Sequence, residues 1–290
     1  MSYTEHIPAE GLRDHIAAYW VRRTGATPGP SGRRVYADGC ADLIFNAGNS
    51  EAWFNPMARA GEMIPLRPGR LYLGGTMTAY GVVYSEPGSV LRGIRFWPGG
   101  FYALFGVPME PAVDGVIEFD DDELKKLMSD EVALPDRLNS WFGRRAVIGD
   151  RKHDFAALYK IALGSGGRVS VETLAGEVHV SNRTLERIFK ENVGISPKEF
   201  LRIVRFQEVL RQLREVGRYG GTVAGTREGT VAGAREGTAP GGEESLLRIA
   251  FDLGYYDHAH LTNEFKKYAG ILPSELSRFY KTGIAGSQYF

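Results

Sequence analysis

The spacing of apolar residues divides the chain into a first part with strand-like runs and a later part with helical periodicity. Up to about residue 117, short β-branched and aromatic runs are bounded by Gly, Pro, Asn and Asp, which predicts a small barrel or sandwich. A helix is expected before these runs, over residues 11–19, because Leu12, Ile16 and Tyr19 recur at helical spacing. The runs that predict strands are 41–45, 70–74, 81–84 and 91–96.

From Asp120 onward the pattern is helical. Acidic residues at 121–123 occupy an expected first helical turn, where the positive end of the helix dipole stabilises them. Amphipathic segments continue to about Leu163, and the Gly/Ser segment 164–167 is predicted to be a flexible linker. The expected division is a β-barrel domain at 1–117, a helical connection at 118–165 and a helical domain at 166–285.

One segment of the helical domain lacks the composition of a packed element. Residues 221–228 and 229–236 are a tandem octapeptide, rich in Gly and poor in large apolar side chains. Such a segment cannot bury enough surface to offset the entropy of ordering. An insertion at 217–244 is therefore predicted to be disordered, and a tolerated surface loop explains it better than a functional tether.

Apart from this insertion, the C-terminal part repeats itself. Residues 185–199 align with residues 261–275, with Leu, Phe, Lys, Gly, Ile, Pro and Glu recurring at a constant offset. Each copy predicts a helix-turn-helix, that is, two short helices joined by a tight turn. Ser181 is the expected cap of the second helix in the first copy, and Asp257 has that place in the second copy.

The two predicted units are joined by a long helix that runs from Pro197 to about Glu215. It begins with a capping box at 196–199, and it carries several Arg and Lys residues beside its apolar positions. Gly194 and Gly270 stand where the preceding helices should end, since glycine adopts the left-handed conformation easily. A basic helix face is usually just solvated, however, so charge alone does not predict DNA binding here.

Charge and composition exclude several classes of protein. Lys+Arg and Asp+Glu both total 35, so the formal net charge is zero, which argues against a nonspecific polycation. The single cysteine, Cys40, excludes an internal disulfide and is expected to be a buried thiol. The start of the chain does not resemble a signal peptide, and no apolar run is long enough to span a membrane. A cytoplasmic protein is expected.

Enzymatic activity is not expected. A metal-binding barrel enzyme needs a cluster of histidines with a carboxylate, but none of the six histidines lies in a predicted strand. His258 and His260 diverge on a helix and should not chelate a metal. No phosphate-binding glycine loop or catalytic triad stands out either. We therefore predict no catalytic residue, no metal and no cofactor.

The doubled motif resembles the DNA-binding domain of the AraC/XylS family of bacterial transcription regulators. The resemblance covers about residues 170–281 and rests on segments 174–175, 181–190, 194–197, 249–255 and 265–275. Two features depart from the family pattern. The insertion is longer than the family's usual link, and Leu272 stands where the family usually has Ser, so the last helix loses its best cap.

This resemblance implies that two recognition helices enter adjacent major-groove segments of double-stranded promoter DNA, about one helical turn apart. By this resemblance, Arg183 or Arg187 would donate hydrogen bonds to guanine, Glu186 would accept from cytosine, and the Asn263 amide would pair with adenine. The residues implied to read bases are Arg183, Glu186, Arg187, His258, Ala259, Thr262 and Asn263. Those implied to contact phosphates are Lys190, Arg202, Arg205, Lys266 and Lys267.

Segments 38–45 and 93–106 look like the N-terminal domain of a subgroup of these regulators, which has a cupin-like β-barrel followed by helices. This implies an α+β multidomain protein whose barrel binds a small effector and forms a homodimer, with RNA polymerase as a further partner. Aromatic residues in a small barrel are more often core, and Arg95 could equally lie at the surface or in an ion pair. The candidate pocket residues are Tyr72, Tyr84, Arg95, Trp97 and Tyr102.

Two alternatives stay open at this point. The barrel could serve dimerisation only, without sensing a ligand. The chain could also be a metal-independent, cupin-like ligand-binding protein or enzyme whose helical domain binds a protein partner.

Overall fold

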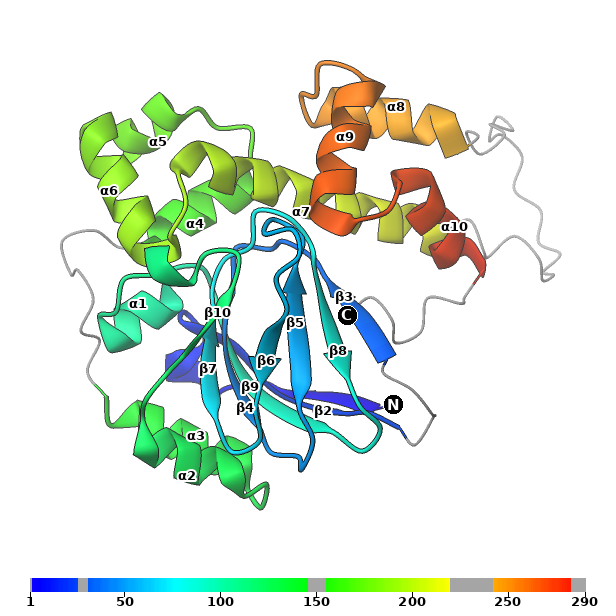
Figure 1. Cartoon of the computed structure of the whole chain (residues 1–290). Coiled ribbons are helices and arrows are strands. Elements are labelled where there is room, and N and C mark those ends of the chain that lie inside the picture. Colours follow the sequence, from blue (N-terminus) through cyan, green and yellow to red (C-terminus); the bar gives the residue numbers. More distant parts are fainter. Residues whose placement is uncertain (1, 26–30, 146–154, 220–241, 283–290) are drawn as a thin grey trace, which may run out of the picture.

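Strands form the first part of the molecule and helices the second (Figure 1). The computed structural model describes residues 2–25, 31–145, 155–219 and 242–282. Within these residues, strands form a six-stranded sheet in the order β1-β2-β9-β4-β7-β10 and a four-stranded sheet in the order β3-β8-β5-β6. The strands are β1 (Ser2–His6), β2 (Ile16–Arg23), β3 (Ser31–Val35), β4 (Ala41–Asn46), β5 (Ala52–Pro56), β6 (Ile64–Leu66), β7 (Leu71–Gly74), β8 (Gly81–Ser85), β9 (Val90–Phe96) and β10 (Val116–Glu118).

The four predicted strand runs are confirmed, as β4, β7, β8 and β9. The pairing is antiparallel throughout, so alternate side chains of each strand point to opposite faces. In β4, Leu43 and Phe45 join a core that packs against helices, whereas Asp42 and Ile44 face the other sheet. The six-stranded sheet is therefore covered by helices on one face and by the four-stranded sheet on the other.

The predicted helix over residues 11–19 is wrong. A short 3-10 helix, η1 (Glu10–Leu12), precedes strand β2, which pairs with β1 on one side and β9 on the other. The pairing with β9 shifts between Ile16 and Ala18, so one extra residue stands there as a β-bulge. The bulge places Ile16 and Tyr19, three positions apart, on the same buried face and thereby imitates helical spacing.

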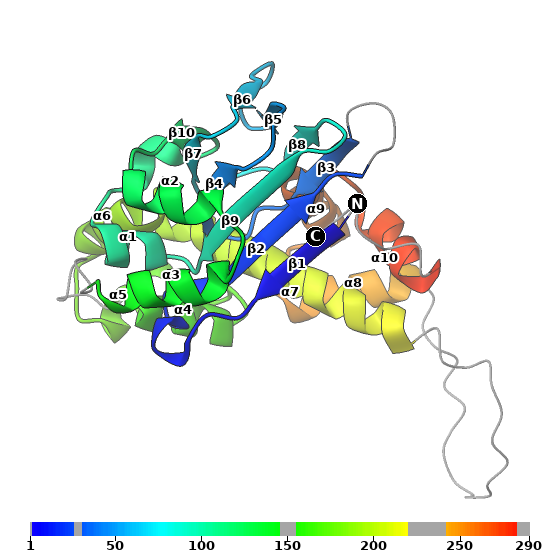
Figure 2. The ribbon, with the colours of Figure 1, turned by 90° about the horizontal axis from the view of Figure 1, so that it is seen from below.

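Helices after the last long strand close the helix-covered face (Figures 1 and 2). An aromatic cluster forms there, in which Phe96 packs edge-to-face against Phe101 and Phe142. The predicted acidic first turn is confirmed, because the Asp121 carboxylate accepts a hydrogen bond from the Leu124 amide at 2.9 Å. The elements here are α1 (Gly100–Phe105), η2 (Glu110–Ala112), α2 (Asp122–Ser129) and α3 (Leu134–Gly143).

The next helix, α4 (Phe155–Gly164), packs with the C-terminal helices. Phe155, Leu158 and Ala162 are buried in the same apolar core as the later helices. The predicted linker 164–167 is a tight turn, in which the Gly167 amide donates to the Ala162 carbonyl at 2.9 Å. The packed C-terminal unit therefore begins at α4, before the expected boundary at residue 166.

Six further helices follow: α5 (Val171–Glu177), α6 (Asn182–Val193), α7 (Pro197–Tyr219), α8 (Gly242–Asp252), α9 (His258–Ala269) and α10 (Pro273–Thr282). Figure 1 shows α7 crossing one end of the barrel, with α5 and α6 near its start and α8 and α9 near its end. Residues 220–241 of the predicted insertion lie outside the described residues, and its outermost residues belong to α7 and α8. In the described part of the chain, no helix has both the length and the apolarity required to cross a bilayer.

Candidate nucleic-acid interface and ligand cavity

The first helix-turn-helix consists of α5 and α6. Ser170 and Ser181 cap these helices, since their hydroxyls accept hydrogen bonds from the Thr173 and Thr184 amides at 3.1 and 3.2 Å. Between the helices, the Val180 amide donates to the Ala175 carbonyl at 3.0 Å. The Ser181 cap was predicted and is confirmed.

The second helix-turn-helix, α8 and α9, repeats this geometry. The Tyr255 amide donates to the Ala250 carbonyl at 2.9 Å, the equivalent of the bond at Val180. Asp257 caps α9 by accepting from the His260 amide at 2.7 Å, as predicted. The second turn is one residue longer, because Tyr256 stands between Tyr255 and the capping residue. The two units thus share the hydrogen bond that closes the turn and the capped recognition helix.

Side chains of the first recognition helix, α6, reach solvent over one face. Arg183 and Arg187 are exposed and stand four positions apart, so they lie on the same side of the helix, with half-buried Glu186 beside them. The opposite side is core, formed by Leu185 and Phe189. The helix therefore presents two guanidinium groups and one carboxylate outward.

The second recognition helix, α9, presents a less charged face. Ala259 and Asn263 are exposed and four positions apart, whereas His258 and Thr262 are half-buried. The His258 Nε2 and Thr262 Oγ1 atoms are both buried, and neither has a hydrogen-bond partner among the described residues. Buried polar atoms ordinarily have such a partner.

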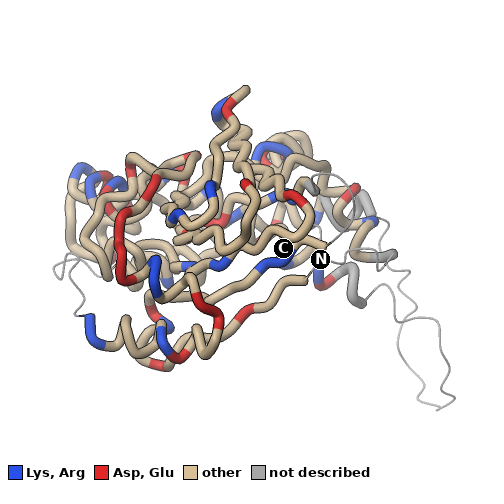
Figure 3. The backbone as a smooth tube through the Cα atoms, turned by 60° about the horizontal axis from the view of Figure 1, so that its bottom comes forward, with Lys and Arg blue, Asp and Glu red and all other residues tan. Residues whose placement is uncertain are grey.

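Most of the predicted phosphate-contacting side chains are engaged within the protein. Lys190 pairs with Glu110 at 3.0 Å and Lys267 pairs with Glu199. Arg202 lies between Glu199 and Glu264 at 3.5 and 3.4 Å. Arg205 donates to the Gly167 carbonyl at 3.2 Å and lies over the Tyr255 ring, and Lys266 is exposed. Basic and acidic residues are interspersed over the molecule, in agreement with the zero net charge (Figure 3).

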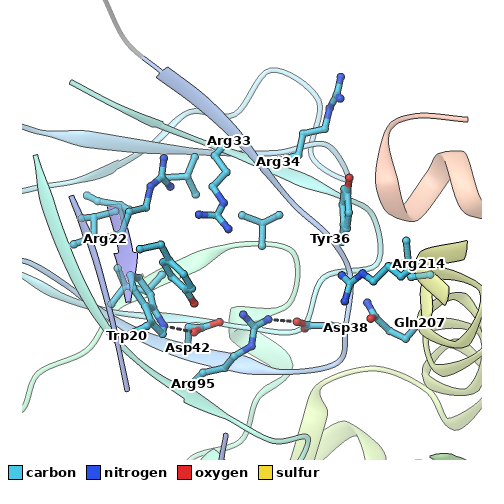
Figure 4. A pocket seen from close by; sticks show the side chains of 17 residues that line it. Trp20, Arg22, Arg33, Arg34, Tyr36, Asp38, Asp42, Arg95, Gln207 and Arg214 are labelled. Atoms are coloured by element: carbon cyan, nitrogen blue, oxygen red, sulfur yellow. Dashed lines mark hydrogen bonds and ion pairs between the residues drawn. The ribbon is translucent and has the colours of Figure 1, made fainter. Parts of the chain in front are cut away.

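A cavity of about 300 Å³ lies between the two sheets, where α7 crosses the barrel (Figure 4). Of the predicted pocket residues, Arg95 lines it. Trp97 lines a second cavity of about 430 Å³, on the other side of the ion pair that Arg95 forms with Asp38. Tyr72, Tyr84 and Tyr102 are not among the described residues that line either cavity. Arg95 is therefore both ion-paired and cavity-lining.

The sequence did not reveal the other charged residues of the first cavity. Arg22 and Arg33 are buried and come from β2 and β3, and Arg214 comes from α7. Arg22 was missed because the preceding residues were assigned to a helix, and Arg33 because no strand was predicted there. The alternation of β2 was the available signal, since Trp20 and Arg22 share the face opposite Tyr19 and Val21.

Burial shifts the pKa of several groups in and near the two cavities. Burial lowers the pKa of Arg22 to about 10, and the neighbouring Arg33 guanidinium contributes in the same direction. Burial raises the pKa of Asp42 to about 7, although the hydrogen bond from Trp20 Nε1 to its carboxylate, at 2.8 Å, lowers it. Cys40 is buried as predicted, and burial raises the pKa of its thiol. No cluster of His, Cys, Asp or Glu suited to a metal ion occurs among the described residues.

Two family models match the chain. Residues 4–118 match a family described as a domain of unknown function (DUF6597), and residues 174–224 match a family described as a helix-turn-helix domain. A Haemophilus influenzae protein described as an uncharacterized HTH-type transcriptional regulator is 28% identical over 105 residues, which are 36% of this chain and 26% of the relative. The chain thus matches about a quarter of that relative's length.

Solved structures also resemble the chain at low sequence identity. ToxT from Vibrio cholerae with a bound unsaturated fatty acid has a TM-score of 0.49 and 11% identity, covering 93% of this chain and 98% of ToxT. ToxT of strain O395 has a TM-score of 0.46 and 10% identity, with 91% and 97% covered. The AraC-like transcriptional activator CuxR has a TM-score of 0.30 and 14% identity, with 71% and 86% covered.

Proposed function

This chain carries a helix-turn-helix domain, and from that premise we propose that it is a sequence-specific DNA-binding transcription regulator of the AraC type. One observation carries the proposal. Two helix-turn-helix units with equivalent closing hydrogen bonds at the turn and a capped second helix are joined by α7, and each recognition helix has exposed side chains. Two such units on one support suit adjacent major-groove segments of the same DNA.

The recognition faces differ in the bases that they suit. The exposed guanidinium groups of Arg183 and Arg187 on α6 can donate two hydrogen bonds each to guanine. On α9, the Asn263 amide suits adenine and the Ala259 methyl group suits thymine. We therefore propose an operator with a guanine-containing segment read by α6 and an A·T-containing segment read by α9.

Phosphate contacts add affinity without sequence preference. The candidates are Lys190, Arg202, Arg205, Lys266 and Lys267, of which Lys266 is exposed and the others have partners within the protein. A phosphate would have to replace those partners. We expect affinity to fall steeply with salt, since phosphate contacts release counterions.

The remaining parts of the proposal concern regulation. The barrel domain binds a small effector and forms a homodimer, and the bound regulator contacts RNA polymerase at a promoter in the cytoplasm. We place the domain boundary between α3 and α4. The helices α1 to α3 pack on the barrel, whereas α4 shares a core with the later helices and belongs to the DNA-binding unit. A ligand cavity bounded by both parts supports effector control.

The test is selection of bound sequences from a random DNA pool with the intact protein, at moderate salt. We expect an enriched motif that spans about two major-groove segments. Arg187→Ala should lose discrimination at the positions read by α6, by about 1–3 kcal/mol per base pair, because a bidentate contact is lost. Asn263→Ala should relax the other half of the motif.

Exposed Arg67 follows β6, outside both helix-turn-helix units, and its ion pair with Glu51 is long, at 3.7 Å, so it provides the matched control. Arg67→Ala should select the wild-type motif with wild-type affinity. Equal loss of affinity for every sequence in Arg187→Ala would reject the base-reading role of this residue. A wild-type protein that enriches no motif under any effector condition would reject the proposed function.

A further inference from the structure

A guanidinium group in the wall of the cavity between the sheets and α7 lacks hydrogen-bond partners within the described part of the chain. Arg22 is 6% exposed, and its Nε and Nη2 atoms are buried without a hydrogen-bond partner among the described residues. A buried arginine is ordinarily paired, because the loss of its hydration is costly unless hydrogen bonds replace it. The structure therefore leaves a strong donor facing an open space.

Positive charge exceeds negative charge around this space. Five arginines line it, and its two carboxylates are both engaged, with Asp38 in the ion pair to Arg95 and Asp42 accepting from Trp20. Arg33 approaches Arg22 from the facing sheet and lies over the Tyr3 ring, with 5.0 Å from its Cζ to the ring centroid (Figure 4). Neither guanidinium forms an ion pair with a carboxylate among the described residues, so an anion placed between Arg22 and Arg33 would accept hydrogen bonds from both.

The remaining wall of the cavity is apolar. Ile44, Leu66, Val83 and Leu91 come from both sheets, and Leu210 comes from α7. A volume of about 300 Å³ with a few polar groups at one end is typical of a site for a small organic molecule. A bare inorganic ion would leave most of this apolar wall uncovered.

We propose that this cavity binds a small amphipathic organic anion, with its carboxylate, sulfonate or phosphate group held by Arg22 and Arg33 and its apolar body against the strands and α7. The anion site is argued from the cavity alone. Its effect, control of DNA binding by the bound anion, rests on the proposed function. Protonation of Asp42 favours the anion, because one negative charge is removed from the cavity wall.

The position of α7 connects the ligand to the DNA-binding units. Gln207 of α7 lines the cavity and donates to the Ala37 carbonyl at 2.6 Å, and the Ala37 amide in turn contacts the Tyr268 carbonyl of α9 at 3.4 Å. Arg214 lines the cavity and donates to the Tyr280 hydroxyl of α10 at 3.1 Å. A ligand that touches Leu210 and Gln207 therefore contacts the helix on which both recognition helices are mounted.

The test uses two fluorescent probes that differ by one anionic group. 8-Anilinonaphthalene-1-sulfonate and the neutral N-phenyl-1-naphthylamine share the same rings. We expect the sulfonate to bind the full-length protein at one site per chain, at least tenfold more tightly than the neutral probe. Arg22→Met should weaken sulfonate binding at least tenfold and leave the neutral probe within about twofold, since a charged hydrogen bond is lost.

Arg67→Met, at an exposed position, is the matched control and should bind both probes like the wild-type protein. Circular dichroism and the unfolding midpoint check that each variant is folded, and Arg33→Met repeats the experiment from the facing sheet if Arg22→Met fails to fold. The proposal is wrong if the wild-type protein binds both probes equally. It is also wrong if sulfonate binding is unchanged in both cavity variants.

A second measurement separates this proposal from the proposed function. The affinity for the selected operator is measured with and without saturating sulfonate. A shift of at least threefold in the wild-type protein, absent in Arg22→Met, supports the coupling through α7. Anion binding without any operator binding would support the cavity assignment and reject the DNA-binding proposal. Operator binding without anion binding would support the DNA-binding proposal and reject the cavity assignment.

Discussion

At the scale of single residues, burial in the cavity wall sets the pKa of Asp42 and the space available at Gly93. Asp42 lies on the cavity face of β4, and Trp20 Nε1 donates to it across Gly93 of the intervening strand β9. Gly93 is required there, because a Cβ at this position would lie 2.0 Å from the Trp20 ring. Burial raises the pKa of Asp42 from its ordinary value near 3.8 to about 7, so its carboxyl titrates close to neutral pH.

This pKa predicts a pH dependence of stability. Between about pH 4 and 7 the folded state binds more protons than the unfolded state, so the free energy of unfolding should fall as pH rises and then level off. Asp42→Asn removes this contribution but keeps an acceptor for Trp20. From pH 5 to 7 the variant should gain stability relative to the wild-type protein by on the order of 2 kcal/mol.

Denaturant unfolding at pH 5, 6, 7 and 8 measures this difference. Asp136→Asn, at an exposed position of α3, is the control and should keep the wild-type profile. Parallel pH profiles for Asp42→Asn and the wild-type protein would contradict the assigned titration.

At the scale of elements, the two helix-turn-helix units differ in how each first helix ends. Both end in a left-handed residue with the same pair of closing bonds, at His179 with φ 54° and at Gly254 with φ 69°. The left-handed conformation is costly for a residue with a Cβ, and glycine avoids that cost. The first unit thus carries backbone strain that the second does not.

We therefore expect His179→Gly to stabilise the protein. The relief of strain exceeds the entropy that glycine loses on folding, so the free energy of unfolding should rise by about 0.5–1 kcal/mol. His179 is exposed, so the change removes little packing. Denaturant unfolding measures the change, with His179→Ala as the comparison that keeps the Cβ. Destabilisation by His179→Gly relative to His179→Ala would contradict the explanation.

Helix α10 shows how a missing cap is replaced. Leu272 stands at the capping position, where the sequence predicted the loss of the best cap. The Glu275 carboxylate accepts a hydrogen bond from the Leu272 amide at 2.9 Å, which is the reciprocal half of a capping box. In the equivalent place on α7, Ser196 accepts from the Glu199 amide at 3.2 Å, and the Glu199 carboxylate instead accepts from the Tyr268 hydroxyl at 3.0 Å.

At the scale of the whole molecule, both recognition helices end against the barrel domain. The Met109 amide donates to the Glu191 carbonyl near the end of α6, at 3.0 Å, and the Tyr80 amide donates to the Lys267 carbonyl near the end of α9, at 3.2 Å. The terminal glycines lie in these contacts, since a Cβ at Gly194 would be 2.3 Å from Val113. The arrangement holds the two units at a set spacing on the barrel.

Comparison of two glycines tests this docking. Gly194→Ala and Gly254→Ala both place an alanine at positive φ, but the space around Gly254 is open. The strain cost should be similar, and Gly194→Ala should cost a further 1–3 kcal/mol or so in unfolding free energy because its Cβ overpacks the interface. Denaturant unfolding of the two full-length variants measures the difference. Equal losses would mean that the contact with Val113 contributes nothing.

The sequence by itself determined the helix-turn-helix units, because the signals that specify them are local. Ser181, Asp257, Gly194 and Gly270 cap helices within a few residues of themselves, and the inward-facing Leu185 and Phe189 follow the period of the same helix. The strand runs of β4 and β9 were predictable for a similar reason, since turn residues bound them. The base-reading assignments rest on the family resemblance and stay predictions.

Only the tertiary structure decided the nature of the cavity. Whether Arg22 points inward depends on the bulge in β2, which is set by pairing with a strand about seventy residues away in the chain. Arg33 and Arg214 reach the same space from the other sheet and from α7. Side chains so distant in sequence share no local pattern, because the free energy that places them comes from sheet pairing and from the packing of α7 across the barrel.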